Sequence, residues 1–375
     1  MNPELIDEIL LTMVEGVGSL TFKRLYDYFG SCDAILSASA EQLQVISGVG
    51  PKTASQIASA RQTHNVEGLL ELCRRERIEI LSQRDRRYPE LLKLIHDPPQ
   101  ILYVKGTLTP QDELAFAVIG TRSMSSYGRK LATQLTRGLV QYGVTIISGL
   151  AKGIDGVAHR AALEMQGRTI AILGGGISRI YPKEHVELAA QIVENGALIS
   201  EYHPLMEPNK GTFPQRNRIV AGMSIGVLVV EAPKKSGAMI TARLAYEQGR
   251  ELFAVPGNVD SVSSGGCNQL IRDGAISVES ADDIFESLGP LFKPIPMKPI
   301  QNPASPVPDE LRHPGELPLN EIEKAVLRHV KTAVTPLERI VQDSELSPHQ
   351  VLVALNVLLR RNLIVSIEQD GFRRI

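Results

Sequence analysis

Short runs of β-branched and other apolar residues recur through the middle of the chain, and each run ends in a loop rich in glycine. The runs cover residues 115–119, 144–147, 169–173, 226–230 and 252–255. Each has the length of a buried parallel strand, and a segment long enough for a helix separates most of them. This alternation predicts an open α/β sheet whose loops gather outside the carboxyl ends of the strands.

The loops that follow these runs carry small residues and cations. Gly120-Thr121-Arg122-Ser123 follows the first run, and a loop over residues 148–155 with Gly149 and Lys152 follows the second. Backbone N–H groups that glycine leaves uncovered, together with helix N-termini, favour anions such as phosphate. We therefore expect Arg122 and Lys152 to bind phosphate at the same edge of the sheet.

Two further segments add candidate cations. Phe213-Pro214-Gln215-Arg216-Asn217-Arg218 is expected to precede an apolar helix, and its two arginines can fork onto phosphates. Asn217 would read a base or cap the turn, and Phe213 is either a stacking platform or part of the core. Lys234 and Lys235 add positive charge beside the loop at Ser236-Gly237.

No set of catalytic residues stands out in the sequence. Walker A, Gly-x-Ser-x-Gly and His-Glu-x-x-His patterns are absent, and Gly174-Gly175-Gly176 lacks the spacing of a dinucleotide loop. Asp155 and His159 lie four residues apart, either as an acid–base pair or, as we favour, as a helix N-cap and a hydrogen-bonded structural histidine. Glu201 and Glu231, at strand ends, are the remaining general acid or base candidates. The sequence thus predicts phosphate binding without catalysis, metal or cofactor.

The chain is predicted to contain three domains and a linker. Residues 1–75 form a helical domain of the helix-hairpin-helix (SAM-like) type, because Gly48 and Gly50 permit a tight turn and Pro51 suits the first helical position. Residues 76–289 form the α/β domain, and the proline-rich residues 290–318 form a semi-extended linker. Residues 319–375 combine three helical patterns with a hairpin, which is typical of a winged helix that binds either a partner or DNA.

Composition narrows the class of protein. The 375 residues are 43% hydrophobic and 22% charged with a formal net charge of −2, so a nucleic-acid site must come from local clusters of Lys and Arg. The three cysteines are far apart, which disfavours a disulfide framework or metal site. The N-terminus lacks a basic stretch, and no apolar run approaches the roughly 18 residues of a membrane span. We expect a cytoplasmic protein that does not enter membranes.

An ordered set of motifs resembles the DNA-processing protein A family (DprA, also called Smf). The set comprises Ile119-Gly120-Thr121-Arg122, residues 148–155, Ala158-His159, Tyr181-Pro182, Ser200-Glu201-Tyr202, residues 213–218, Glu231-Ala232, Ser236-Gly237, Thr241-Ala242 and Pro256-Gly257. The family's usual Gly-Ser-Arg reads Gly-Thr-Arg here, which keeps a hydroxyl. The resemblance covers the central region continuously and implies an extended Rossmann-like, doubly wound sheet.

The resemblance also implies a function and a site. The chain would bind and protect incoming single-stranded DNA during natural transformation and help load the RecA recombinase onto it. Carried over by position, the DNA pocket would use Arg122, Lys152 and Arg216-Asn217-Arg218, with Gly120 and Gly149 admitting the strand's backbone. The family dimerises through the later part of this domain, and Leu270 and Ile271 lie beside polar residues in a short predicted helix. We therefore expect a homodimer interface at Cys267, Asn268, Leu270 and Ile271.

Two other classes of protein remain as alternatives. A nucleotide-processing hydrolase of the lysine-decarboxylase-like type shares this kind of sheet, but its Pro-Gly-Gly-x-Gly-Thr-x-x-Glu motif is replaced here by the sequence of residues 231–241. A duplex-DNA transcription regulator would need a basic recognition helix, and the third C-terminal helix offers few cations beyond Arg360 and Arg361.

Overall fold

The structure of the chain is a computed structural model, which describes residues 3–289, 319, 321–331, 334–344, 346–360, 363–367 and 371–374. Within it the chain forms two compact units, Met1–Ile284 and Phe285–Ile375, and each is described by itself. The predicted proline-rich linker over residues 290–318 lies outside the described residues.

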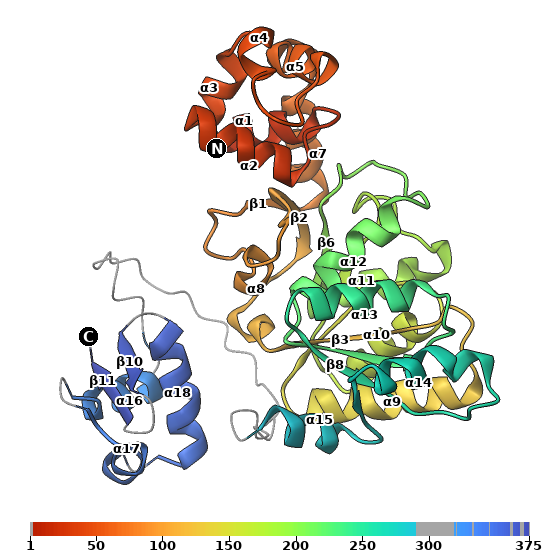
Figure 1. Cartoon of the computed structure of the whole chain (residues 1–375), viewed down its shortest axis with the longest axis vertical. Coiled ribbons are helices and arrows are strands. Elements are labelled where there is room, and N and C mark those ends of the chain that lie inside the picture. Colours follow the sequence, from red (N-terminus) through yellow and green to blue (C-terminus); the bar gives the residue numbers. More distant parts are fainter. Residues whose placement is uncertain are drawn as a thin grey trace. The chain divides into compact units, whose positions relative to one another are not determined.

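A nine-stranded sheet forms the centre of the first unit (Figure 1), with the strand order β1-β2-β6-β5-β4-β3-β7-β8-β9. The strands from β6 to β9 along this order run parallel, whereas β2 is antiparallel to both β1 and β6. The predicted α/β sheet is confirmed, and two antiparallel strands extend it. The strands are β1 (Ile78–Ser82), β2 (Ile101–Gly106), β3 (Ala115–Gly120), β4 (Thr145–Ser148), β5 (Thr169–Ile172), β6 (Gly196–Ser200), β7 (Gly226–Glu231), β8 (Glu251–Ala254) and β9 (Ile276–Ser277).

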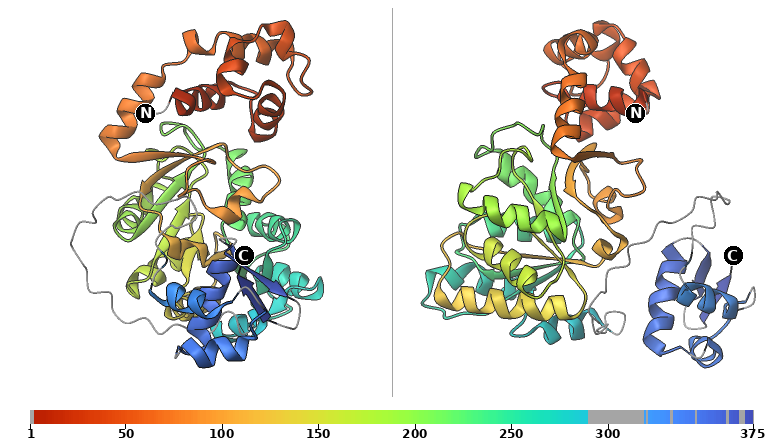
Figure 2. Two further views of the ribbon diagram at one scale, coloured as in Figure 1. Left: turned by 90° about the vertical axis from the view of Figure 1, so that its left-hand side faces the viewer. Right: turned by 180° about the vertical axis from the view of Figure 1, so that it is seen from behind.

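Helices cover both faces of this sheet, which makes it doubly wound, as Figures 1 and 2 show. The chain moves outward from β3 through β4 and β5 to β6 on one side, and from β7 through β8 to β9 on the other. The topology therefore reverses at β3, where ligands of open α/β sheets bind. One layer contains α9 (Ser126–Gln141), α10 (Ile154–Glu164) and α11 (Val186–Glu194), and the other contains α12 (Thr212–Gly222), α13 (Gly237–Glu247) and α14 (Gly265–Arg272).

A buried ion pair joins three central strands at the edge opposite to the glycine loops. The Asp112 carboxylate, just before β3, accepts hydrogen bonds from Arg168 Nε at 2.7 Å and Nη2 at 2.8 Å. It also accepts a bond of 3.0 Å from the hydroxyl of Thr145, the first residue of β4. Because Arg168 directly precedes β5, this network ties the starts of β3, β4 and β5 together.

The helical front of the chain shares its hydrophobic core with the sheet. Buried side chains of the helices pack in one cluster with Tyr103 of β2 and Leu188 of α11. The predicted hairpin turn is confirmed, since Gly48 has φ +93° and Pro51 opens α5 after the N-cap Gly50. The helices are α1 (Pro3–Met13), α2 (Ser19–Phe29), α3 (Cys32–Ser37), α4 (Ala40–Leu43), α5 (Pro51–Ala58), α6 (Ala60–Thr63) and α7 (Val66–Glu76), and α8 (Glu90–Lys93) follows β1.

The second unit has a core of its own, which Val326, Ile340, Val351, Leu355 and Leu358 dominate. Its elements are α16 (Glu321–His329), α17 (Leu337–Ser344), α18 (Pro348–Arg360), β10 (Ile364–Ile367) and β11 (Gly371–Arg374), while α15 (Ala281–Leu288) spans the division between the units. Three helices and an antiparallel hairpin match the predicted elements, and the winged-helix assignment stays a prediction. Arg361 lies outside the described residues. Across the described ranges, no helix is both long and apolar enough to cross a membrane.

Candidate functional site

The loop after β3 stands at the point where the sheet topology reverses. Thr121 N donates a hydrogen bond of 2.7 Å to the carbonyl of Glu231, and the hydroxyl of Thr121 accepts one from Ser123 N at 3.2 Å. Ser125 then caps α9 by accepting a hydrogen bond from Gly128 N at 3.0 Å. Hydrogen bonds therefore hold the backbone of this loop, while the Arg122 side chain that it carries is exposed.

Glycine lets the loop after β4 pack directly against this first loop. A Cβ on Gly153, whose φ is +81°, would come within 2.2 Å of the carbonyl oxygen of Thr121. A Cβ on Gly120 would lie 2.5 Å from Ile154 Cγ1. No larger residue fits at either position without displacing the neighbouring loop. This close approach places Arg122 and the exposed Lys152 on adjacent loops at one edge of the sheet.

Asp155 has a different local role from the predicted one. Gly153 is the N-cap residue of α10, so Asp155 lies inside the first turn, where its buried carboxylate accepts hydrogen bonds from Gly149 N at 3.1 Å and Ala151 N at 3.4 Å. The ring of His159 instead pairs with the Thr169 hydroxyl at 2.7 Å, and burial lowers its pKa to about 3. Asp155 thus supports the loop, and the two side chains have separate partners.

Arg216 lies beneath the two loops and is almost fully buried. Its Nη1 donates to the carbonyl of Gly149 at 2.8 Å and also to that of Ile172, so one guanidinium joins the ends of β4 and β5. Burial lowers the pKa of Arg216 to about 10, although the nearby Asp155 opposes this shift. Burial likewise raises the pKa of the Asp155 carboxyl. A Cβ on Gly149 would lie 2.4 Å from Arg216 Nη2, so this glycine makes room for the guanidinium.

The segment at residues 213–218 lies inside α12, which begins at Thr212, and not before a helix as the sequence suggested. Because residues two apart on a helix do not share a face, the side chains of Arg216 and Arg218 point in different directions. Phe213 is half-buried, with Arg122 Cζ 5.2 Å from the centre of its ring. The exposed ring of Tyr181 lies 5.7 Å from that of Phe213 at 44°. The result is a row of an arginine and two aromatic rings beside the β3 loop.

Arg218 points to the other side of α12 and is held by carboxylates. Its Nη1 and Nη2 donate to the two oxygens of Glu201 at 2.7 and 2.6 Å, and its Nε donates to Asp97 Oδ2 at 2.9 Å. The carboxylate of the buried Glu231 accepts a hydrogen bond of 2.8 Å from Ser125 N at the start of α9. Both general acid or base candidates, Glu201 and Glu231, therefore have hydrogen-bond partners within the fold.

The remaining predicted DNA-contact residues are more peripheral. Asn217 is half-buried and donates to the carbonyl of Gly237 at 3.4 Å, which links α12 to the start of α13. Lys234 and Lys235 are exposed in the loop between β7 and α13.

The residues predicted for the dimer interface lie on α14 and do not share one environment. Cys267 and Leu270 are buried in the core of the sheet, with exposed fractions of 0% and 9%. The side chain of Asn268 bonds both the N–H and the carbonyl of Gly257. Ile271 is half-buried and packs at the margin of the core. Contact with a partner subunit through Cys267 would require α14 to leave the sheet.

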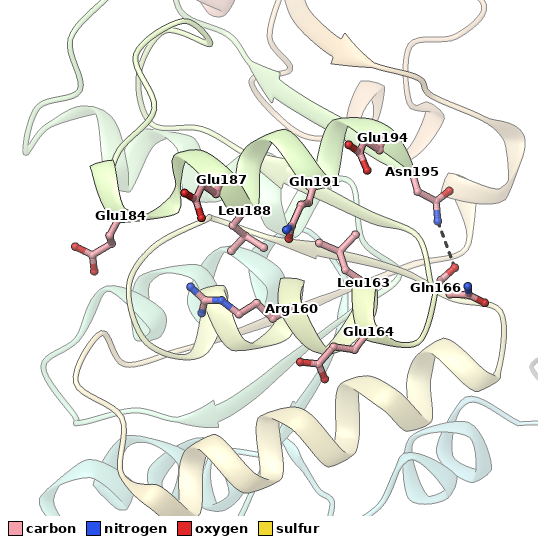
Figure 3. A pocket seen from close by; sticks show the side chains of 10 residues that line it. All are labelled: Arg160, Leu163, Glu164, Gln166, Glu184, Glu187, Leu188, Gln191, Glu194 and Asn195. Carbon is pink, nitrogen blue, oxygen red and sulfur yellow. Dashed lines mark hydrogen bonds between the residues drawn. The ribbon is translucent and has the colours of Figure 1, made fainter.

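A carboxylate that the sequence did not single out contacts the site. Glu184 Oε2 lies 2.6 Å from Lys152 Nζ, and about half of each side chain is exposed. Glu184 also stands at one end of a groove of about 810 Å³ between α10 and α11 (Figure 3). Four glutamates and one arginine carry the charges that line this groove: Glu164, Glu184, Glu187, Glu194 and Arg160. The groove is net acidic and does not suit a phosphate chain.

The chain matches known proteins over its sheet and its helical front. The family model for DNA recombination-mediator protein A matches residues 79–289, and a SAM-like helix-hairpin-helix tandem matches residues 8–63. DNA processing protein DprA of Bacillus subtilis is 39% identical over 264 residues, which cover 68% of this chain and 87% of that protein.

Two solved structures resemble the fold. DNA processing protein A from Streptococcus pneumoniae has a TM-score of 0.65 and 34% identity, covering 75% of this chain and 97% of that one. DNA processing protein A from Helicobacter pylori, described for its single-stranded DNA binding mode, has a TM-score of 0.51 and 31% identity, covering 57% and 97%. The chain therefore belongs to the DNA recombination-mediator protein A family, with the DprA and Smf proteins.

The positions of Arg216 and Arg122 predict effects of very different size when each is mutated to alanine. Arg216→Ala leaves two strand-end carbonyls without their donor and Asp155 without its nearby cation, so unfolding should become easier by about 3–5 kcal/mol. Arg122→Ala removes an exposed side chain and should change the free energy of unfolding by no more than about 0.5 kcal/mol. Urea unfolding of both variants measures these changes. Wild-type stability of Arg216→Ala would rule out the supporting role.

Proposed function

We propose that the chain binds single-stranded DNA at the carboxyl edge of its sheet, protects it, and acts in DNA processing during natural transformation. The observation that carries this proposal is the placement of Arg122 and Lys152, two exposed cations on adjacent glycine loops at the topological switch point. The Helicobacter pylori protein, described as binding single-stranded DNA, shares the fold, which supports single-stranded DNA as the ligand of this chain.

Arg122 and Lys152 would neutralise phosphates, while the aromatic row beside them would accept bases. Stacking on aromatic rings tolerates any base, which suits a binder that does not select sequence. Phe213 and Tyr181 offer adjacent rings for this purpose. Gly120, Thr121, Ser123, Gly149 and Asn217 would line the path of the strand, with Lys234 and Lys235 at its margin. Arg216 and Arg218 would act from beneath as positioning residues, because both are buried and held by groups of the fold.

We propose that the chain is a binding protein and not an enzyme. Glu201 and Glu231, the two carboxylates at strand ends, hold Arg218 and the start of α9 in place. That arrangement supports binding over the nucleotide-processing hydrolase. Robust hydrolysis of a nucleoside monophosphate by the pure protein would favour the hydrolase instead.

RecA loading extends this proposal. We propose that the bound strand is transferred to RecA in the cytoplasm, with residues 1–75 and a winged helix at residues 319–375 as accessory domains that tune binding. Faster RecA filament formation on DNA coated by a single-strand-binding protein would support the transfer. No acceleration at saturating amounts of this chain would contradict it.

The salt dependence of binding tests the phosphate clamp. Each phosphate neutralised on a single strand contributes about −0.7 to the slope of log affinity against log salt. Arg122→Ala and Lys152→Ala should each make the slope for oligothymidine shallower by about that amount, and the double variant by about twice as much. Arg243→Ala removes an exposed cation from α13 and serves as a control. A folded double variant with wild-type affinity and slope would refute the proposed site.

The pair between Lys152 and Glu184 predicts a variant that binds more tightly. Exposed ion pairs contribute at most about 1 kcal/mol, so a phosphate can displace Glu184 from Lys152, but the carboxylate competes. Glu184→Gln removes this competitor and should raise the affinity for oligothymidine by up to about fivefold. Glu187→Gln changes the same charge on the neighbouring helix and is the control. Equal binding by both variants would show that Glu184 does not compete with the strand for Lys152.

We propose that the homodimer forms at the outer side of α14. Of the apolar residues predicted for the interface, Ile271 is the one that is only half-buried and lies at the margin of the core. Ile271→Arg would place an unpaired charge in an apolar interface and should convert the dimer to monomer in sedimentation experiments. Leu94→Arg introduces the same charge at a side chain that is 76% exposed and should leave the dimer intact. A dimer of unchanged stability in Ile271→Arg would exclude this interface.

A further inference from the structure

The face of α9 that turns away from the sheet is polar and cationic. Ser126, Arg129, Lys130, Thr133 and Arg137 recur at intervals of three and four residues, which places them in one stripe along the helix. Arg129 and Lys130 are exposed. A helix that only covers a sheet needs polar residues on this face, but it does not need them to have one sign of charge.

This stripe forms one wall of a groove of about 680 Å³. The other wall is Ser280 together with Ala281 and Asp282 at the start of α15. Gly138 permits the two helices to meet, because a Cβ at that position would lie 2.5 Å from the Cβ of Ala281. The lining cations Arg129, Lys130 and Arg137 outnumber the one lining carboxylate, Asp282, which accepts a hydrogen bond from the Tyr142 hydroxyl.

The groove begins where the proposed phosphate clamp ends. α9 starts four residues after Arg122, and Ser126 at its first turn already lines the groove. From Ser126 to Arg137 the stripe extends about 16 Å at a rise of about 1.5 Å per residue. A strand held at Arg122 could therefore continue along α9 without leaving cationic surface. On α10, by contrast, Glu164 and its neighbours line the acidic groove, which bars the path on that side.

We propose that the groove between α9 and α15 is a second subsite for single-stranded nucleic acid, which binds the sugar–phosphate backbone of the strand as it leaves the Arg122 clamp. Arg129 and Lys130 are the principal cations of this subsite, and Ser126 adds a hydroxyl at its start. Arg137 is partly neutralised by Glu164 at 2.7 Å and marks the far end. The inference rests on the proposed function, since the subsite would bind a further part of the strand that the Arg122 clamp holds.

Binding of full-length protein to oligothymidines of increasing length tests the subsite. Arg129→Gln/Lys130→Gln should match wild type on the shortest oligonucleotides that bind, because these fill the clamp alone. On longer strands the variant should stop gaining affinity at a shorter length than wild type. Loss of two phosphate contacts should make its salt slope shallower by about 1.4. Between 50 and 200 mM salt, wild-type affinity should then fall about sevenfold further than that of the variant.

Arg74→Gln/Arg75→Gln is the matched control, since it removes two adjacent exposed cations from another helix, α7, with the same change in net charge. Equal effects of the two double variants, or none on long strands, would overturn the subsite. A loss confined to blunt duplex of the same length would also overturn it. Failure of the proposed function would give a different result from failure of the subsite. In that case Arg122→Ala/Lys152→Ala would bind oligothymidines of every length as wild type does.

Discussion

The contact on which the glycine-loop edge depends is the buried guanidinium of Arg216. A buried charge is costly unless hydrogen bonds and an opposite charge compensate it. Here the carbonyl groups of Gly149 and Ile172 and the carboxylate of Asp155 provide that compensation. Asp155 in turn accepts the N–H groups of the β4 loop. One cation beneath the surface therefore holds the ends of β4 and β5 together, and the loop that carries Lys152 follows β4.

This arrangement divides the cations of the chain into two kinds. Arg216 and Arg218 are buried, so their donors serve the fold. Arg122 and Lys152 are exposed. The buried network holds the loop of Lys152, and the hydrogen bond from Thr121 N to the carbonyl of Glu231 holds the loop of Arg122. A binding site gains from this division, because a flexible cation on a fixed loop meets its ligand with little loss of conformational freedom in the backbone. The glycines at 120, 149 and 153 are part of the same constraint, since each leaves no room for a side chain.

The sequence was sufficient to predict the sheet and the hairpin turn at Gly48, because both depend on local patterns. It could not assign Arg216 and Arg218, because the burial of an arginine depends on which loops fold over it. The predicted start of α12 was wrong for a related reason. Pro214 suits a first turn, but the helix begins before it at Thr212, whose hydroxyl bonds the carbonyl of Gly174 in a distant loop. Glu184 carried no local signal, and Tyr181 stood out only through the family resemblance, which gave its ring no role.

The formal net charge is only −2, but positive and negative side chains are concentrated on different parts of the surface. Helices of the same layer carry opposite signs on their outer faces, with cations along α9 and glutamates along α11. Screening limits the range of such charges to about 8–10 Å at moderate salt, so a strand responds to the helix that it touches and not to the molecule's net charge. On the proposed path, the acidic face would repel a strand and the basic face would attract it. A protein of nearly neutral composition can therefore define one path for a polyanion over its surface.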